Sequence, residues 1–350
     1  MTYFYLLGLL QANATEIPVT SSNGHASNPV WSNDGAMLAF EVNDNAGKID
    51  LFSVSMSGVD FQDIKQIKAS VGGASFGSGG SINAAPVWLK RGGKWVVVFE
   101  HARKGVPNRI YSKDPIRPAR PVIQTDKLGG DLSWPTLSKD FTKMYFISDA
   151  TGAGDIYSYT LQGPERQKLE TVVASDNFSE MAPVLNDSGT LLYTRKHGNG
   201  EDVYVTAGGS DSKWVGGNGD QTRPAWAENT VVFFSNERGV DLWDVVSSNK
   251  PSQKTVLAKG VRLPMRAAPS ISPDNQWVVY GMEDPKKSSS LWFSKLDGSK
   301  TISYKTEHIA CGEPSLTESD GRILLAYTAL PAEGSAWRKL HVVDVTDLFQ

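Results

Sequence analysis

A short unit that begins with proline recurs seven times along the 350 residues of the chain, and it restricts the fold more than any other feature. Its clearest copy is Pro29-Val30-Trp31-Ser32-Asn33-Asp34-Gly35, followed by an apolar run and then by Asp50-Leu51-Phe52. A period of roughly 40–50 residues is typical of a four-stranded propeller blade. The repeat therefore predicts an all-β fold, a seven-bladed β-propeller of four-stranded antiparallel blades, with six blades as the alternative. The leading prolines are Pro29, Pro86, Pro135, Pro183, Pro224, Pro269 and Pro314.

The positions of the unit have physical reasons. Proline suits the start of a first strand, because no ladder donor is lost there. The second residue after the proline is apolar in all seven copies, and we expect Trp31, Trp88 and Trp226 at this position to be buried between blades. The following strand is almost entirely apolar, as expected for a strand that is covered on both faces.

The outer strands of each unit carry weaker signals. An aspartate begins the expected third strand in four units, at Asp50, Asp155, Asp202 and Asp241. Weak fourth strands are predicted between the units at Ile64–Lys68, Thr171–Val173 and Lys254–Leu257.

The order Pro-x-Trp-Ser-x-Asp-Gly followed by Asp-Leu-Phe or Asp-Leu-Tyr resembles the repeat of TolB-type propellers, which are divergent relatives of the WD repeat. The resemblance extends over roughly residues 20–345 and implies a propeller that binds or scaffolds proteins of the cell envelope. TolB itself has an α/β domain before its propeller and usually six blades, whereas the first repeat here starts near residue 28 and seven copies follow.

The N-terminal segment supplies two predictions. Residues 15–20 have no partner in the first unit, so we expect them to form the outer strand of the last blade and to close the ring. We therefore predict one propeller domain over residues 15–350. Before it, the apolar run Tyr3–Leu10 and the A-x-A site at residues 12–14 resemble a short secretory signal, the alternative being an ordinary strand or a remnant. A signal at residues 1–14 implies a periplasmic or secreted protein.

Composition excludes several classes of function. The net charge of -3 gives no reason to expect a nucleic-acid partner. No apolar run reaches the roughly 20 residues that a transmembrane helix needs. The single cysteine, Cys311, excludes a disulfide framework, and we expect it to be a small residue of the core. We predict no cofactor, and a monomeric domain.

No catalytic residues are predicted. The Gly-Ser runs Gly72–Ser81 and Gly208–Ser210 lack the strand-to-helix context of a hydrolase nucleophile, and we interpret both as loops. The turns at 44–47 and 149–152 lack the spacing of a calcium loop. The histidines are isolated in the sequence, and only His25 and His308, at the entrances of the first and last units, form a weak candidate pair for a metal.

The remaining candidate site is one mouth of the central channel, where the first strands of all units converge. Tryptophan and arginine at such a mouth are typical of binding hot spots. We therefore predict a protein or peptide partner in the cell envelope. The alternative is a polysaccharide-active enzyme, a lyase or a hydrolase, with its site in the channel. The candidate residues just before the prolines are Asn28, Asn83, Trp134, Glu180, Arg223, Arg266 and Glu313.

Overall fold

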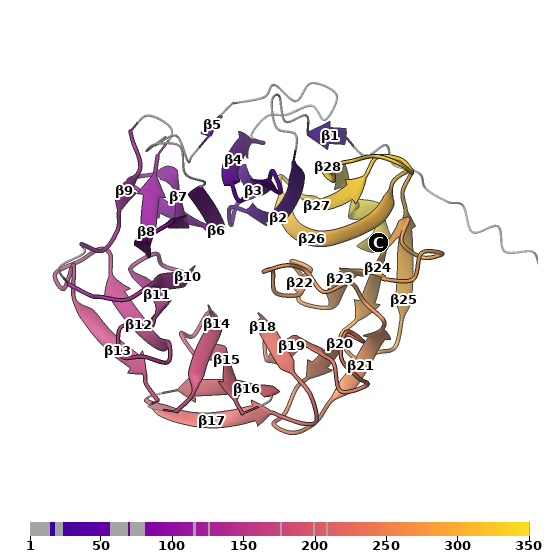
Figure 1. Ribbon diagram of the computed structural model, residues 1–350. Coiled ribbons are helices and arrows are strands. Elements are labelled where there is room, and N and C mark those ends of the chain that lie inside the picture. The colour runs from indigo at the N-terminus through magenta and orange to yellow at the C-terminus, as the bar shows by residue number, and fades with distance from the viewer. Residues whose placement is uncertain are drawn as a thin grey trace, which may run out of the picture.

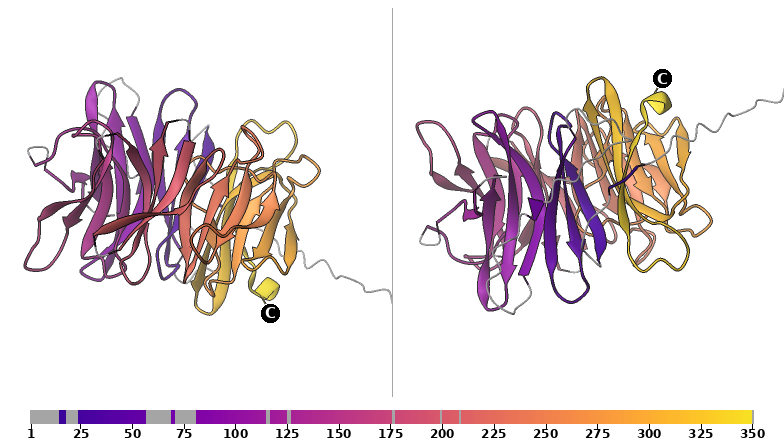
Figure 2. Two further views of the ribbon diagram at one scale, coloured as in Figure 1. Left: turned by 90° about the horizontal axis from the view of Figure 1, so that it is seen from below. Right: turned by 90° about the horizontal axis from the view of Figure 1, so that it is seen from above.

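The computed structural model describes residues 15–17, 24–56, 69–70, 81–114, 117–124, 127–175, 177–198, 200–207 and 209–349. This part of the chain is all-β apart from one short 3-10 helix, η1 (Thr346–Phe349). The sheets are arranged around a common centre (Figure 1), and Figure 2 shows the same ring from its two sides. This is the arrangement of a β-propeller, in which the sheets are the blades.

Four sheets of four consecutive antiparallel strands make up the second half of the ring. The first two contain β10 (Leu132–Leu137), β11 (Lys143–Ser148), β12 (Asp155–Thr160), β13 (Leu169–Val173), β14 (Ser179–Leu185), β15 (Leu191–His197), β16 (Gly200–Ala207) and β17 (Ser210–Val215). The next two contain β18 (Gln221–Ala227), β19 (Thr230–Ser235), β20 (Asp244–Ser248), β21 (Thr255–Lys259), β22 (Ser270–Ile271), β23 (Trp277–Gly281), β24 (Ser290–Lys295) and β25 (Thr301–Lys305).

An eight-stranded sheet precedes them, and one parallel pair, Ile49 with Ile82, joins its two halves. Its strands are β2 (His25–Trp31), β3 (Met37–Asn43), β4 (Ile49–Ser55), β5 (Ala69–Ser70), β6 (Ser81–Arg91), β7 (Lys94–Arg103), β8 (Val106–Lys113) and β9 (Arg120–Pro121).

A further four-stranded sheet unites the two ends of the described chain. Its order is β1-β28-β27-β26, and β1 pairs antiparallel with β28 in the register Thr15 with Val342. The strands are β1 (Thr15–Ile17), β26 (Ile309–Ser319), β27 (Arg322–Leu330) and β28 (Lys339–Asp344).

The core lies between neighbouring sheets, as the apolar second strands predict. One cluster joins Leu89 and Val98 of the β6–β9 half-sheet to Met144 and Phe146 of the next sheet. Trp31 and Trp88 are buried, 7% and 5% exposed, which confirms their predicted place between sheets. Trp226 is less buried than these two, but it packs against the core cluster between two sheets and contacts Trp214 edge-to-face.

The third strand of one repeat is misplaced by the sequence pattern. β20 begins at Asp244, whereas Asp241 lies in the preceding turn, and its neighbours Val240 and Leu242 are 84% and 47% exposed. Asp244 accepts a hydrogen bond from Gly260 N and forms an ion pair with Arg238. These contacts stabilise the start of β20. Of the other aspartates of this position, Asp155 begins its strand as predicted, whereas Asp50 and Asp202 are the second and third residues of β4 and β16.

Two predicted fourth strands coincide with β13 and β21, and the third, Ile64–Lys68, lies outside the described residues. The thiol of Cys311 is buried, as predicted. Among the helices of the described ranges, none is long and apolar enough to cross a bilayer.

Candidate functional site

Six first strands contain the same irregularity, which we name the proline bulge. Two residues, the second of them the proline of the repeat, face a single buried aromatic residue on the second strand. The extra residue makes the strand bend, as bulges do. The bulge pairs are Asn28-Pro29, Ala85-Pro86, Trp134-Pro135, Ala182-Pro183, Arg223-Pro224 and Glu313-Pro314, and the aromatic residues are Phe40, Phe99, Phe146, Tyr193, Phe233 and Tyr327.

The first residue of every bulge has a left-handed backbone. Its φ lies between 48° and 53° in all six, although none of them is glycine. Such a conformation is uncommon for residues with a side chain. The backbone N–H of this residue needs an acceptor, and in three cases a side chain from the second strand of the preceding repeat supplies it: Glu41 Oε1 for Ala85 N at 2.8 Å, Glu100 Oε1 for Trp134 N at 2.6 Å and Thr194 Oγ1 for Arg223 N at 3.1 Å.

The sheet of β22–β25 replaces its bulge by a longer loop, residues 263–269, which we name the central loop. Val261 pairs with Met282 and Ser270 pairs with Val279, so seven residues of the first strand face Tyr280. The other six first strands have two residues at this place. The segment before β22 extends toward the centre of the ring (Figure 1).

Arg266 of the central loop reaches across the centre of the ring. Its Nη1 binds Glu100 Oε2 at 2.7 Å, and its guanidinium lies 5.9 Å from the ring centre of Trp134. Glu100 belongs to β7, which is in neither of the two sheets next to β22. The side chain of Glu100 is only 5% exposed and that of Arg266 is 30% exposed, so the ion pair is shielded at the carboxylate and open to solvent at the guanidinium.

Two further contacts hold the central loop. Glu313 Oε1 accepts a hydrogen bond from Met265 N at 3.3 Å, while its Oε2 accepts one from Asn28 N at 2.9 Å. The guanidinium of Arg223 donates to the carbonyl oxygen of Pro264. Five of the seven predicted site residues, Asn28, Trp134, Arg223, Arg266 and Glu313, are thus brought into one cluster around the loop.

Glu41 adds a second buried carboxylate to this cluster. Its Oε1 accepts hydrogen bonds from Asn28 Nδ2 and Ala85 N, and the residue is 1% exposed. Burial raises the pKa of Glu41 to about 7, although both hydrogen bonds and the charge of Arg266 favour the ionised form. The carboxyl group therefore gains or loses its proton close to neutral pH.

The other two predicted residues lie away from the cluster. Asn83 is buried and bridges two strands, with Nδ2 on Ile49 O and Oδ1 on the ring of His101. Glu180 is buried in an ion pair with Arg195, at 2.8 Å. Both residues come three positions before their proline and so precede the bulge. Their contacts stabilise the sheets.

Sequence reasoning missed Glu41 and Glu100, which bind the bulges. A signal exists, because each is an acidic residue directly after the aromatic residue of an otherwise apolar second strand. A carboxylate at such a buried position needs partners.

The remaining sequence candidates have separate surroundings. His25 Nδ1 accepts a hydrogen bond from Arg338 N and contacts the ring of Trp337, whereas His308 bonds to Tyr327 and stacks on His341. No group of three potential metal ligands occurs within the described ranges. The letters of residues 73–77, Gly-Ala-Ser-Phe-Gly, do match the G-x-S-x-G pattern of hydrolase nucleophiles, but they lie outside the described residues.

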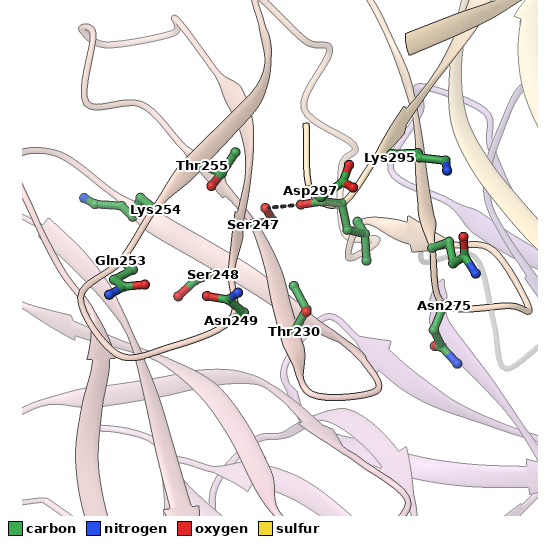
Figure 3. Close-up of a pocket in the computed structure, with 12 residues that line it drawn as sticks. Thr230, Ser247, Ser248, Asn249, Gln253, Lys254, Thr255, Asn275, Lys295 and Asp297 are labelled. Carbon is green, nitrogen blue, oxygen red and sulfur yellow. Dashed lines mark hydrogen bonds between the residues drawn. The ribbon is translucent and has the colours of Figure 1, made fainter. Parts of the chain in front are cut away.

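A separate polar pocket of about 560 Å³ lies between the sheets of β18–β21 and β22–β25 (Figure 3). Hydroxyl and amide groups face it, together with two lysines and one aspartate, and Ser247 donates to Leu296 O at its floor. No residue predicted from the sequence lines it. The lining residues are Thr230, Ser247, Ser248, Asn249, Gln253, Lys254, Thr255, Asn275, Gln276, Lys295, Leu296 and Asp297.

Comparisons with known proteins identify the fold. No family model matches the sequence, and no curated protein matches it. Among solved structures, TolB from Acinetobacter baumannii is similar with a TM-score of 0.51 and 14% identity, over 89% of this chain and 64% of that one. A puromycin-hydrolysing peptidase of Mycobacterium tuberculosis gives 0.62 and 12%, over 94% and 56%. A puromycin hydrolase gives 0.64 and 13%, over 97% and 55%. The chain thus spans less than two thirds of the length of these proteins, and at such identities the likeness shows a TolB-like propeller fold alone.

Proposed function

We propose that this chain is a binding module that captures a protein or peptide at the centre of its ring. The observation that carries the proposal is a cluster at the centre of the ring. Arg266 of the central loop meets Trp134 there, and Glu313 accepts a hydrogen bond from the neighbouring Met265 N, so that three sheets contribute to one site. Tryptophan and arginine are the residues that most often dominate binding energy. Charged hydrogen bonds to backbone and to carboxylates give such a site directional specificity.

The proposal includes the architecture of the ring. We infer that the eight-stranded sheet is two blades, because a single residue pair joins its halves and each half has its own proline bulge. Seven blades then surround the channel, and β1 is the closing strand of the last one. Residues 15–350 are accordingly proposed as one domain, and the cluster exists only when the ring is closed.

The proposed location is the periplasm or the exterior of the cell. It rests on the apolar run and A-x-A site of residues 1–14, which lie outside the described residues. Fusing residues 1–22 to a reporter enzyme that is active only after export tests it. Activity of the fusion supports export, and its absence together with full cytoplasmic retention contradicts it.

The test of binding is capture from an extract of the cell envelope, with the whole chain immobilised. Trp134→Ala should weaken capture by about 1–3 kcal/mol, whereas Arg223→Ala, which frees Pro264 O of the central loop, should change capture and stability together. Arg117→Ala, a change at a side chain that is 78% exposed, is the matched control and should capture as wild type does. Capture that ignores both central substitutions contradicts the site. Polysaccharides assayed alongside test the enzymatic alternative.

A second candidate function is hydrolysis of a small amide or peptide. The favouring observation is that two puromycin hydrolases align over more of this chain, at TM-scores of 0.62 and 0.64, than TolB does at 0.51. Ser75, within the G-x-S-x-G pattern, is the residue to test. Release of the amino acid from puromycin by wild type, lost in Ser75→Ala, would establish this function. Equal background rates in both would exclude it.

A further inference from the structure

We propose that the central loop is an internal pseudo-ligand, and that its Arg266 occupies a socket for the guanidinium of an arginine in the partner. The socket consists of the Glu100 carboxylate and the face of Trp134. An arginine side chain of the bound peptide takes this place when the loop moves aside. This inference rests on the proposed function and specifies its ligand as an arginine-bearing peptide.

The loop contains more residues than the sheet needs. Between the residues that pair with the second strand, the β18 sheet has Arg223-Pro224 and the β22 sheet has residues 263–269. Removing residues 263–267 would leave Ala268-Pro269, which is the same pair as the bulge Ala182-Pro183. The five additional residues therefore lie outside the pairing of the sheet, although Leu263 packs against its core, and they bring Arg266 to the centre of the ring.

The socket is built for a planar cation. Oε1 of Glu100 accepts a hydrogen bond from Trp134 N, and its Oε2 accepts one from the guanidinium. The bond to Trp134 N holds the carboxylate in place before any ligand binds. The guanidinium lies within cation–π distance of the indole. A guanidinium is more weakly hydrated than an ammonium and presents a rigid fork of donors, so this site favours arginine over lysine.

Charge makes the exchange selective. Glu100 is almost fully buried, and Glu41, also buried, interacts electrostatically with Arg266. Withdrawing Arg266 without replacement would leave a buried carboxylate unpaired, which is strongly unfavourable. The loop can therefore leave only when another cation enters. A neutral or acidic peptide cannot displace it.

The tip of the loop is accessible, whereas its base is held by Leu263, which packs against the core, and by the buried Pro264. Met265 at its tip is 56% exposed, and the side chain of Arg266 is 30% exposed. Beyond the ion pair, the hydrogen bonds that fix the tip are those from Met265 N to Glu313 and from Arg223 to Pro264 O. Both are directed to backbone atoms, which a peptide backbone can replace.

The test is a variant that lacks residues 263–267, compared with wild type by calorimetry. The probes are two short blocked peptides that differ only in arginine or its neutral isostere citrulline. We expect the variant to bind the arginine peptide at least about tenfold more tightly than the citrulline peptide, and more tightly than wild type does. Adding Glu100→Gln to the variant should remove the preference. Equal binding of both peptides by a folded variant, or binding of neither, overturns the proposal.

Arg266→Ala provides a second test that tolerates failure of the deletion to fold. Ethylguanidinium should raise the melting temperature of Arg266→Ala by several degrees more than ethylammonium does, because it refills the socket. Arg117→Ala should show no such difference. Absence of rescue in Arg266→Ala overturns the socket. Capture from the envelope extract by wild type tests the proposed binding function, and the peptide and rescue measurements test the socket. Failure of one can therefore be told from failure of the other.

Discussion

The indole Nε1 of Trp31 donates a hydrogen bond of 2.9 Å to the carbonyl oxygen of Ser315, although 284 positions separate the two residues. Trp88 makes the same bond to Val30 O of the preceding repeat. In both cases the acceptor is the residue directly after the proline of the preceding repeat. The tryptophan of the repeat thus ties the first strands of neighbouring repeats together, and in the case of Trp31 it does so where the two ends of the described chain meet.

Replacing Trp31 by alanine should lower the free energy of unfolding by about 3–5 kcal/mol, because it leaves a cavity between two sheets. Trp226→Ala should cost less, since this side chain is half-buried. Urea denaturation followed by circular dichroism measures both. Equal losses in the two variants would contradict the difference in burial.

Removing β1 should destabilise the ring. A chain that starts at residue 18 loses the pairing of β1 with β28 and exposes an edge of the last sheet, so we expect a loss of several kcal/mol. A chain that starts at residue 15 keeps β1 and is the matched control. Thermal melting compares the two, and identical melting temperatures would show that the strand does not close the ring.

The pH dependence of stability should report Glu41. Because its pKa is raised to about 7 in the folded protein, the folded state holds the proton more tightly than the unfolded state between pH 4.5 and 7. Stability therefore decreases as pH rises through this window, by as much as about 3 kcal/mol. The groups that face the carboxylate are Asn28, the Ala85 backbone, Arg266 and Glu313.

Glu41→Gln keeps the acceptor for Asn28 and Ala85 and cannot ionise. The variant should match wild type near pH 4.5 and exceed its stability above pH 7. Chemical denaturation at several pH values measures this difference. Parallel pH profiles for the two proteins would mean that Glu41 does not titrate in this range.

Sequence periodicity predicted the sheets well, because each strand recurs with a proline and an apolar run that burial on both faces demands. It failed where one repeat deviates locally. Asp241 resembles the other third-strand aspartates in sequence. The strand begins three residues later than this pattern predicts, so Asp244 is its first residue. No local pattern distinguishes these two aspartates.

The candidate site could be predicted only in part. Asn28, Trp134, Arg223 and Glu313 directly precede their prolines, so the repeat placed them at the channel. Arg266 reaches the centre of the ring because it lies on the central loop. The seven residues of this loop do not change the proline-to-proline distance of the repeat noticeably, so the sequence does not reveal the loop. Its partner Glu100 is 166 positions away, and only the closed ring brings the two together.

Two ion pairs of this protein should differ widely in their contribution to stability. Arg195 binds Glu180 at 2.8 Å and Asp211 at 2.7 Å, and its guanidinium lies 4.4 Å from the ring centre of Tyr204. The side chain of Glu180 is fully buried. Arg195→Ala should therefore cost about 3–5 kcal/mol, because it leaves that carboxylate unpaired.

The contrasting pair is Lys139 with Asp187, at 2.5 Å, whose side chains are 65% and 80% exposed. Lys139→Ala should cost less than about 1 kcal/mol, since water and salt screen exposed charges. Urea denaturation at low and high salt measures both variants. The Lys139 pair should weaken further with salt, whereas the cost of Arg195→Ala should change little, because Glu180 is shielded from solvent ions. A cost for Arg195→Ala near that of Lys139→Ala would contradict this contrast between the buried and the exposed ion pair.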